Sequence, residues 1–324
     1  CPVITVAGTN GKGSTCAMLE ACLLEAGYRP SVYTSPHLVH FQERCRVHGE
    51  TVQPDELLPH FAKVEAARTQ GSEVSLTYFE FTTLAILSLM ASSPIDVAIL
   101  EVGLGGRLDA VNVIEPTCSI ITSVDLDHMD FLGHDRETIG REKAGVFRAD
   151  KPAVIGETDI PQSVLKYGQD IQAQLLCINT DYQYSATEAG FNWQGVHTRL
   201  DGLPLTAVPL QNIATALTAL EALALLPSQQ QAAKVLAELS LPGRMQWLSK
   251  TPGILLDVAH NPQSAGYLAA QLQFIKERYD RVHLLVGMLK DKDIQQSLAP
   301  FHQLADQWHL VDLPGARGAQ ASML

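Results

Sequence analysis

The sequence predicts an α/β fold with a mostly parallel sheet, a small antiparallel insertion and a smaller Rossmann-like α/β domain at the C-terminus. Three observations predict it. Short β-like apolar runs alternate with amphipathic helical stretches along most of the chain. A glycine-rich loop follows the first of these runs. Between residues 182 and 208 the alternation gives way to short strand-like pieces.

Strands are expected where short runs of β-branched and apolar residues are bounded by turn residues. These runs lie at 2–7, 31–34, 96–102, 117–124 and 152–156. Between them, apolar residues recur at the spacing of one helix face. The helices fit residues 13–26, 54–69, 78–91, 135–147 and 161–173. Strands separated by helices favour parallel pairing, so the first part of the chain is expected to form one sheet.

The second half of the chain contains the insertion and a second α/β pattern. In the insertion, Gly195 and Asp201-Gly202 are interpreted as turns between antiparallel strands. A long apolar helix is expected at 210–226. After residue 241 a strand, a helix and a strand fit 253–258, 262–279 and 282–287. The predicted domains are therefore 1–241 and 242–324.

Composition excludes several functional classes. The 324 residues are 46% hydrophobic and carry a net charge of −12 without a run of lysines and arginines, which argues against binding nucleic acid or an acidic membrane. The longest apolar stretches, such as 213–226, are interrupted well short of a membrane-spanning length. The six cysteines lack C-x-x-C spacing, which indicates reduced thiols rather than disulfides or zinc. We expect a cytoplasmic monomer with small-molecule partners.

The glycine-rich loop runs from Gly8 to Thr15 and nearly matches the nucleotide-binding pattern G-x-x-x-x-G-K-[ST]. That pattern would place a glycine at position 6, where the chain has Val6. A strand, a glycine-rich turn and an immediate helix form the context in which backbone N–H groups hold phosphate. Lys12 would then reach the terminal phosphates, and Ser14 or Thr15 would touch Mg²⁺. The alternative is a glycine-rich turn that starts a helix, with Lys12 in solvent.

Acidic residues follow two of the predicted strands. Glu101 ends one strand, and the segment 125–130, which contains His128, follows the next. Because the carboxyl ends of parallel strands meet at one edge of a sheet, Glu101 is well placed as an oxygen ligand for Mg²⁺. His128 is either a structural residue or a ligand. The cluster has no zinc signature, because it lacks a second histidine at helical spacing and any thiolate.

Five ordered motifs together resemble the folylpolyglutamate synthase/dihydrofolate synthase group of the Mur ligase family. They are Gly8-Thr9-Asn10-Gly11-Lys12-Gly13-Ser14, Thr34-Ser35-Pro36-His37-Leu38, Glu101-Val102-Gly103-Leu104-Gly105-Gly106-Arg107-Leu108-Asp109-Ala110, Asp127-His128 with Leu132-Gly133, and Asp257-Val258-Ala259-His260-Asn261-Pro262. The resemblance extends over essentially the whole chain, and the unusual spacing of the loop is a variant of that family.

The resemblance implies a P-loop ATPase domain followed by a glutamate-ligase domain. It implies that ATP, with Mg²⁺, phosphorylates a carboxylate of dihydropteroate or a reduced folate. The amine of L-glutamate then attacks the acyl phosphate and forms an amide. Phosphorylation makes physical sense because a carboxylate is a poor electrophile, and cations must offset the charge that gathers between two anions.

The resemblance also implies roles for individual residues. The implied ATP-binding residues are Asn10, Gly11, Lys12, Gly13, Ser14, Asn212, Arg244 and Asp257, the last two from the second domain. The implied metal ligands are Ser14, Ser35, Glu101, His128 and Lys143, a lysine that the family carboxylates. The implied substrate contacts are Thr77, Tyr78, Phe79, Glu80, Phe81, Leu108, Asp109 and Ala110. The implied catalytic residues are Lys12, His128, Lys143 and His260, the last near the γ-phosphate.

Structural alternatives stand beside these roles. Ser35 fits a turn before Pro36, and Arg244 fits a surface charge. Phe79 and Phe81 are expected to be partly core, and the charged helix 54–69 to be only a solvated face. For Lys143 the residues alone favour surface solvation, whereas the resemblance predicts a lysine partly buried near His128.

The ends of the chain and its reaction leave further alternatives. Because the chain starts at Cys1 and the family has a segment before the first strand and a longer C-terminal domain, a fragment at both ends is expected. Two functions compete with ligation. One is a P-loop phosphotransferase or ATPase that forms no amide. The other is an inactive folate-binding fragment.

Overall fold

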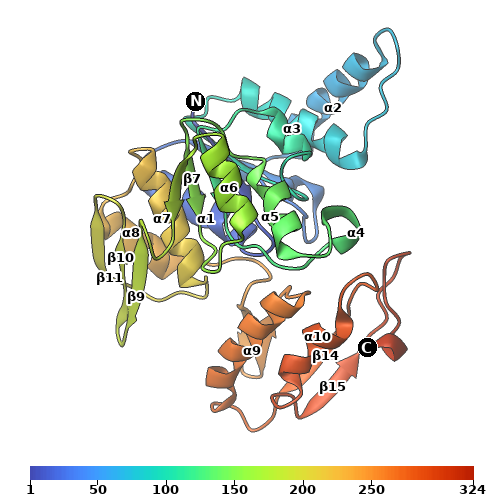
Figure 1. The fold of residues 1–324 in the computed structure, drawn as a ribbon. Coiled ribbons are helices and arrows are strands. Elements are labelled where there is room, and N and C mark those ends of the chain that lie inside the picture. The colour runs from blue at the N-terminus through green and yellow to red at the C-terminus, as the bar shows by residue number, and fades with distance from the viewer. The chain divides into compact units, whose positions relative to one another are not determined.

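The computed structural model describes all 324 residues, which divide into two compact units, Cys1–Ser240 and Leu241–Leu324 (Figure 1). An eight-stranded sheet in the order β4-β3-β2-β5-β1-β6-β7-β8 forms the centre of the first unit. Its strands are β1 Val3–Ala7, β2 Pro30–Tyr33, β3 Cys45–Val47, β4 Glu50–Thr51, β5 Val97–Glu101, β6 Cys118–Ile121, β7 Pro152–Ile155 and β8 Gln174–Cys177. All pair in parallel except β3 and β4, which pair antiparallel at one edge.

Strand β1 lies at the middle of the sheet, between β5 and β6. Val6 pairs with Glu101 on one side, and Ala7 pairs with Ile121 on the other. The chain leaves β1 toward β2 on the β5 side and only later reaches β6 on the opposite side. The carboxyl end of β1 is therefore a topological switch point, which is where open α/β sheets bind ligands.

Helices cover this sheet because its central strands are buried and need apolar partners. The helices of the first unit are α1 Lys12–Glu25, α2 Pro54–Thr69, α3 Tyr78–Ser92, α4 Met129–Leu132, α5 Arg136–Ala144, α6 Gln162–Asp170, α7 Leu210–Ala222 and α8 Gln229–Glu238, with short 3₁₀ turns η1 Phe41–Arg44 and η2 Ala110–Val113. Helix α1 packs against α7 and α8, and α2 packs against α3. None of the helices combines the length and hydrophobicity that a membrane span needs.

The insertion is a three-stranded antiparallel sheet of β9 Gln183–Thr187, β10 Gly190–Gln194 and β11 Arg199–Leu203. Gly195 begins the turn between β10 and β11, as expected, since its N–H donates to the carbonyl of Thr198 at 2.8 Å. The interpretation of Asp201-Gly202 as a turn was wrong. Both residues lie inside β11, where the register with β10 shifts and Gly202 has a φ of +63°. A glycine inside a strand marks such an irregularity as readily as a turn.

The second unit is a smaller α/β domain. Its elements are the antiparallel pair β12 Gln246–Lys250 and β13 Gly253–Leu256, the helices α9 Pro262–Lys276 and α10 Ile294–Leu298, the parallel pair β14 His283–Val286 and β15 Gln307–Leu310, and the turns η3 Ala299–Phe301 and η4 Ala321–Met323. Helix α9 contributes Ala265 and Ala269 to a core with Phe301 and Leu304.

These elements confirm the predicted fold class. Every expected strand and helix is present. The sequence did not indicate helix α8, and the other elements that it missed are short or lie at the edge of a sheet, such as β3, β4 and β8. All six cysteines are free thiols, and five of them are buried.

Candidate active site

The glycine-rich loop joins β1 to α1 and is shaped by two close approaches. Gly8 has a φ of +151°, and a Cβ there would lie 1.9 Å from Oγ1 of Thr122. Gly11 has a φ of +85°, and its Cβ would lie 2.7 Å from Nδ2 of Asn212. No side chain caps the N-terminus of α1. The backbone N–H groups of the loop at the start of α1 are therefore not covered by side chains, which is the arrangement that binds phosphate.

The end of β6 holds this loop in place. The backbone N–H of Thr9 donates to the carbonyl of Ser123 at 2.9 Å, and the N–H of Asn10 donates to Oγ of Ser123 at 2.9 Å. Oγ1 of Thr122 donates to the carbonyl of Asn10 at 2.6 Å. Sequence reasoning assigned Thr122 and Ser123 only to a strand. Hydroxyl groups at the end of a strand next to a phosphate loop are the signal that would have identified them.

Lys12 lies across the loop instead of extending away from it. Its Nζ donates to the carbonyl oxygens of Gly8 at 2.8 Å and Thr9 at 3.2 Å. Two residues later, Ser14 is buried, and its Oγ accepts a hydrogen bond from Nδ2 of Asn212 at 2.9 Å. The predicted residues Lys12, Ser14 and Asn212 therefore come together around the first turn of α1.

Glu101 lies beside that first turn. It ends β5, is 5% exposed, and its Oε2 accepts the backbone N–H of Ser35 at 2.9 Å. Its Oε1 would lie 3.9 Å from a Cβ added to Gly13. A carboxylate and the segment that carries Ser35 are thus next to the phosphate loop. Carboxylate and hydroxyl oxygens are the hard donors that Mg²⁺ prefers, so these residues fit the predicted ion.

Lys143, on α5, is buried, with 3% of its surface exposed, so the surface-solvation alternative was wrong. Burial, together with the positive charge of Lys12, lowers the pKa of its amine to about 7, while Asp127 acts in the opposite direction. Gly106, in the loop after β5, packs on its backbone, where an added Cβ would lie 3.1 Å from Cα of Lys143. The amine is therefore partly neutral near pH 7, as carbamate formation requires.

His128 lies at the N-terminus of α4, downstream of β6, in a left-handed conformation with a φ of +51°. Its backbone N–H donates to Oδ1 of Asp127 at 2.9 Å, and its Nε2 lies 3.9 Å from Oδ2 of the same residue. No group of three or more histidine, cysteine, aspartate or glutamate side chains is arranged to hold a metal. A magnesium site here would therefore depend on hydroxyl ligands and a modified Lys143 in addition to Glu101 and His128.

Two of the predicted substrate residues form local structure with their side chains. Thr77 and Glu80 make a capping box at the start of α3, in which the N–H of Thr77 donates to Glu80 at 2.7 Å and the N–H of Glu80 donates to Thr77 at 3.2 Å. The sequence Thr77-Tyr78-Phe79-Glu80 has the T-x-x-E spacing of this motif. Their side chains therefore set the start of α3.

Asp109 has a similar local role at η2. It accepts the N–H groups of Leu104 at 2.8 Å and Val111 at 2.9 Å, and burial raises the pKa of its carboxyl group. Ala110 is the first residue of that turn, and Leu108 is 79% exposed beside it. Asp109 thus fixes the loop that presents Leu108 and Ala110.

The aromatic residues of α3 divide between core and surface. Phe79 stacks on Tyr33 at 6.1 Å, and its ring would lie 2.5 Å from a Cβ added to Gly103. It is therefore core in part, as expected. Tyr78 is 63% exposed.

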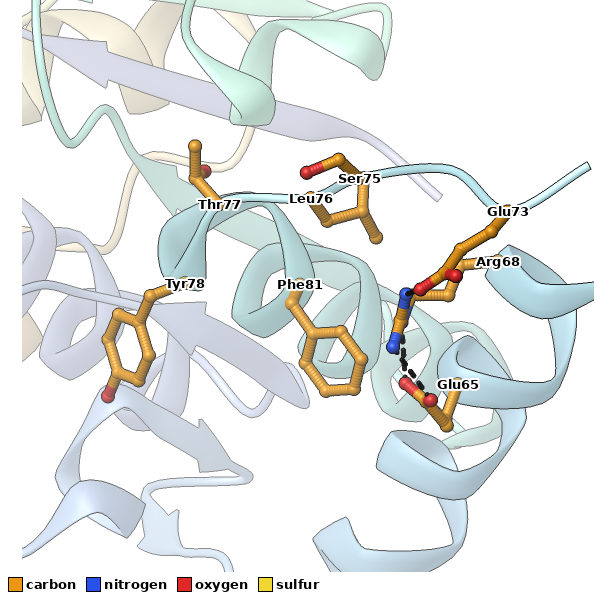
Figure 2. A pocket seen from close by; sticks show the side chains of 8 residues that line it. All are labelled: Glu65, Arg68, Glu73, Ser75, Leu76, Thr77, Tyr78 and Phe81. Carbon is orange, nitrogen blue, oxygen red and sulfur yellow. Dashed lines mark hydrogen bonds and ion pairs between the residues drawn. The ribbon is translucent and has the colours of Figure 1, made fainter.

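A pocket of about 540 Å³ lies between the end of α2 and the start of α3 (Figure 2). Its lining residues are Glu65, Arg68, Glu73, Ser75, Leu76, Thr77, Tyr78 and Phe81. Arg68 pairs with Glu65 at 2.6 Å and with Glu73 at 2.7 Å, as the dashed lines show for Glu65. Helix 54–69 was interpreted as only a solvated face, but its end forms one wall of this pocket. The sequence did not indicate the pocket, because its other wall comes from the start of α3.

The remaining predicted residues belong to the second unit. Asp257 accepts the N–H groups of Met245 at 2.9 Å and Ala259 at 2.8 Å, which ties the segment after β13 to the residue that follows Arg244. Nδ1 of His260 lies 2.9 Å from the carbonyl oxygen of Val258. Within this unit the structure therefore brings the segments of Arg244 and Asp257 together.

Comparisons with known proteins agree along the chain. Residues 6–198 match the Mur ligase middle domain, and residues 243–324 match the Mur ligase glutamate ligase domain. The chain is 45% identical over 322 residues to dihydrofolate synthase/folylpolyglutamate synthase of Escherichia coli K12, an alignment that covers 99% of this chain and 75% of that protein.

Solved structures give the same result. The complex of E. coli FolC with DHPP and ADP superposes with a TM-score of 0.96 at 45% identity, covering 99% of this chain and 77% of that one. A bifunctional folylpolyglutamate synthase/dihydrofolate synthase with Mn, AMPPNP and L-glutamate bound superposes with a TM-score of 0.93 at 48% identity, covering 100% of this chain and 78% of that one.

Proposed function

The chain belongs to the Mur ligase family, in its dihydrofolate synthase/folylpolyglutamate synthase group, and we propose that the residues around Lys12 carry out its chemistry. It is a ligase that forms carbon–nitrogen bonds. It uses ATP and Mg²⁺ to add L-glutamate to dihydropteroate, to tetrahydrofolate (poly)glutamate or to both, through an acyl phosphate. The observation that carries the assignment to this site is the convergence of a bare phosphate loop, Glu101 and the buried Lys143 at one sheet edge.

In the first step an oxygen of the substrate carboxylate forms a bond to the γ-phosphorus of ATP, and ADP leaves. The loop N–H groups bind the phosphates at the start of α1. Lys12 exchanges the carbonyl oxygens of Gly8 and Thr9 for phosphate oxygens and follows the transferring group. Asn212 keeps Ser14 and the loop in position through its hydrogen bond.

In the second step the amine of L-glutamate forms a bond to the acyl carbon, phosphate leaves and the nitrogen loses a proton. Bound Mg²⁺ supplies charge neutralisation between the carboxylate and the phosphates. Ser14, Ser35, Glu101, His128 and Lys143 would hold it. Arg244 and Asp257 complete the proposed ATP-binding set, and His260 is the proposed residue near the γ-phosphate.

Lys143 becomes a ligand only after modification, because an ammonium has donors and no acceptor. Its neutral amine forms a bond to the carbon of CO₂ and releases a proton, which yields a carbamate with two oxygens. The buried position and the pKa of about 7 support this reaction at neutral pH. The carbamate also replaces a positive charge near Lys12 by a negative one.

The substrate contacts are proposed at the aromatic start of α3 and the loop before η2. Tyr78 and Leu108 are exposed and apolar, which suits the flat ring of a pterin or benzoyl group. Phe79 packs on Tyr33, and Asp109 holds the loop next to Leu108 through its hydrogen bonds. We also propose that the protein acts as a cytoplasmic monomer, which light scattering and cell fractionation test.

Product analysis tests the ligase reaction. Purified protein is incubated with ATP, Mg²⁺ and dihydropteroate or tetrahydrofolate, with and without L-glutamate. Release of phosphate that depends on glutamate, together with a new amide seen by mass spectrometry, is the expected result. ADP formation that is independent of glutamate would instead show an ATPase, and substrate binding without ADP formation would show an inactive folate-binding protein.

A further inference from the structure

Arg44 is a buried guanidinium for which the first unit provides no carboxylate partner. It ends η1, is 7% exposed, and is the one arginine among the buried polar side chains. Its Nε donates to Nδ1 of His37 at 2.8 Å. The rings of Phe41 and Tyr78 lie 5.8 and 5.6 Å from its Cζ. Glu43 is engaged elsewhere, because it accepts the N–H groups of residues 38–40.

This arrangement is unusual because a buried charge is normally paired. The neighbouring Arg46 follows the rule and pairs with Glu20 at 2.7 Å. Aromatic faces offset only part of the cost of burying a guanidinium. The charged guanidinium of Arg44 therefore has no anionic acceptor for its N–H donors. A planar anion such as a carboxylate would supply one.

Arg44 lies between the proposed substrate contacts and the proposed metal ligands. Tyr78, on one side, is a proposed substrate contact. On the other side, the carbonyl of Arg44 accepts the N–H of Thr34 at 2.9 Å, one residue before Ser35, whose own N–H donates to Glu101. The charges of Arg44 and Asp109 both act on the pKa of the Tyr33 hydroxyl, which burial raises to about 12. Arg44 and Asp109 thus each lie near enough to Tyr33 for their charges to act on its hydroxyl.

We propose that Arg44 binds the non-reacting carboxylate of a folate substrate and so distinguishes folates from dihydropteroate. The inference rests on the proposed function. Dihydropteroate carries a single carboxylate, which reacts. A folate ends in a glutamyl group with two carboxylates, of which one reacts and the other must be held in a partly desolvated site. A guanidinium presents parallel N–H donors that match a carboxylate, so it binds such a group with defined orientation.

The two substrates provide an internal control for Arg44→Met, which keeps an unbranched stem between Phe41 and Tyr78 but removes the charge. KM for tetrahydrofolate is expected to rise about 30-fold, the loss of one charge-assisted carboxylate contact, while KM for dihydropteroate changes less than about twofold. Arg44→Lys should lose less than Arg44→Met. The matched control is Arg148→Ala, which removes another partly buried arginine that already pairs with Glu115. It should change neither value.

A second comparison changes the ligand instead of the protein. A tetrahydrofolate analogue with a hydrogen in place of the non-reacting carboxylate should have a higher KM than tetrahydrofolate with the wild-type protein. With Arg44→Met the two compounds should have equal KM values. The wild-type arm can refute the inference even where Arg44→Met fails to fold by its melting temperature, because equal KM values for the two compounds would show that the protein does not bind this carboxylate. In that case Arg44→Lys replaces Arg44→Met in the second arm.

Three outcomes would overturn the inference. An equal rise in KM for both natural substrates would indicate that Arg44 only supports the loop or binds the reacting carboxylate. An unchanged KM for tetrahydrofolate would indicate no contact. A wild-type protein that ligates glutamate to dihydropteroate but not to tetrahydrofolate would remove the substrate that Arg44 recognises. Failure of the ligase assignment is separate, because it would show as no glutamate-dependent amide with either substrate.

Discussion

Nδ2 of Asn212 donates a hydrogen bond to Oγ of Ser14 at 2.9 Å, across 198 positions of sequence, and both side chains are buried. The same amide lies where a side chain on Gly11 would point. Helix α7 therefore sets the shape of the phosphate loop as much as β1 and α1 do.

Gly11→Ala should impair ATP binding more than its backbone strain alone accounts for. The added Cβ would lie 2.7 Å from Asn212 Nδ2, so the amide must move away from Ser14. The matched control is Gly27→Ala, where φ is +86° and nothing lies within 4 Å. Both variants should lose roughly 1 kcal/mol of stability from the positive φ, measured by denaturant unfolding. Only Gly11→Ala should raise KM for ATP, by about tenfold or more; equal KM values for the two variants would contradict the close approach.

Lys12→Ala should abolish ATP-dependent turnover and leave the fold intact. The variant loses the ammonium that follows the transferring phosphoryl group, and loss of such a contact costs about 100-fold or more in rate. ADP formation and the melting temperature are measured together. Lys63→Ala, on the exposed part of α2, is the control and should keep full activity. Unchanged ADP formation by Lys12→Ala would rule out the phosphate-loop assignment.

Lys143→Ala should lose activity, because the proposed carbamate ligand can no longer form. Short carboxylates such as acetate or formate should restore part of it, since they supply an oxygen donor of similar size. Lys166→Ala, on α6, is a control that should neither lose activity nor respond to acetate. Full activity of Lys143→Ala without added carboxylate would show that the lysine has no role as a ligand.

Lys143 should also make stability depend on pH when CO₂ is removed. The ordinary pKa of a lysine amine is 10.5, and the pKa of Lys143 in the folded protein is about 7, so the unfolded state binds more protons between these values. Stability should therefore rise as the pH rises from about 7 to 10.5, and the cost of the buried charge is fully present below pH 7. Lys143→Met should remove this cost, on the order of 5 kcal/mol at low pH, with the difference from wild type vanishing above pH 10.5. If the difference in unfolding free energy between the two proteins were the same at every pH, that result would contradict the depressed pKa.

The sequence by itself determined the features that depend on neighbouring residues. The strand ending at Ala7, the glycine-rich turn and the helix from Lys12 follow from local patterns, and so does the position of Glu101 at the end of a strand. The five motifs were sufficient to identify the family and its reaction. The capping box of Thr77 and Glu80 could also be predicted, because its T-x-x-E spacing is local. These two residues were assigned a substrate role instead.

Only the tertiary structure decided what lies beside each of these residues. Lys143 belongs to a charged helical segment whose sequence predicts an exposed face. In the fold it is nevertheless buried near Lys12 and Asp127. Arg44 has Glu43 next to it in sequence, but that carboxylate turns to backbone N–H groups and leaves the guanidinium between two aromatic rings. The physical reason is that helix and strand patterns arise from neighbours along the chain. Burial and charge pairing arise from segments that meet only after folding.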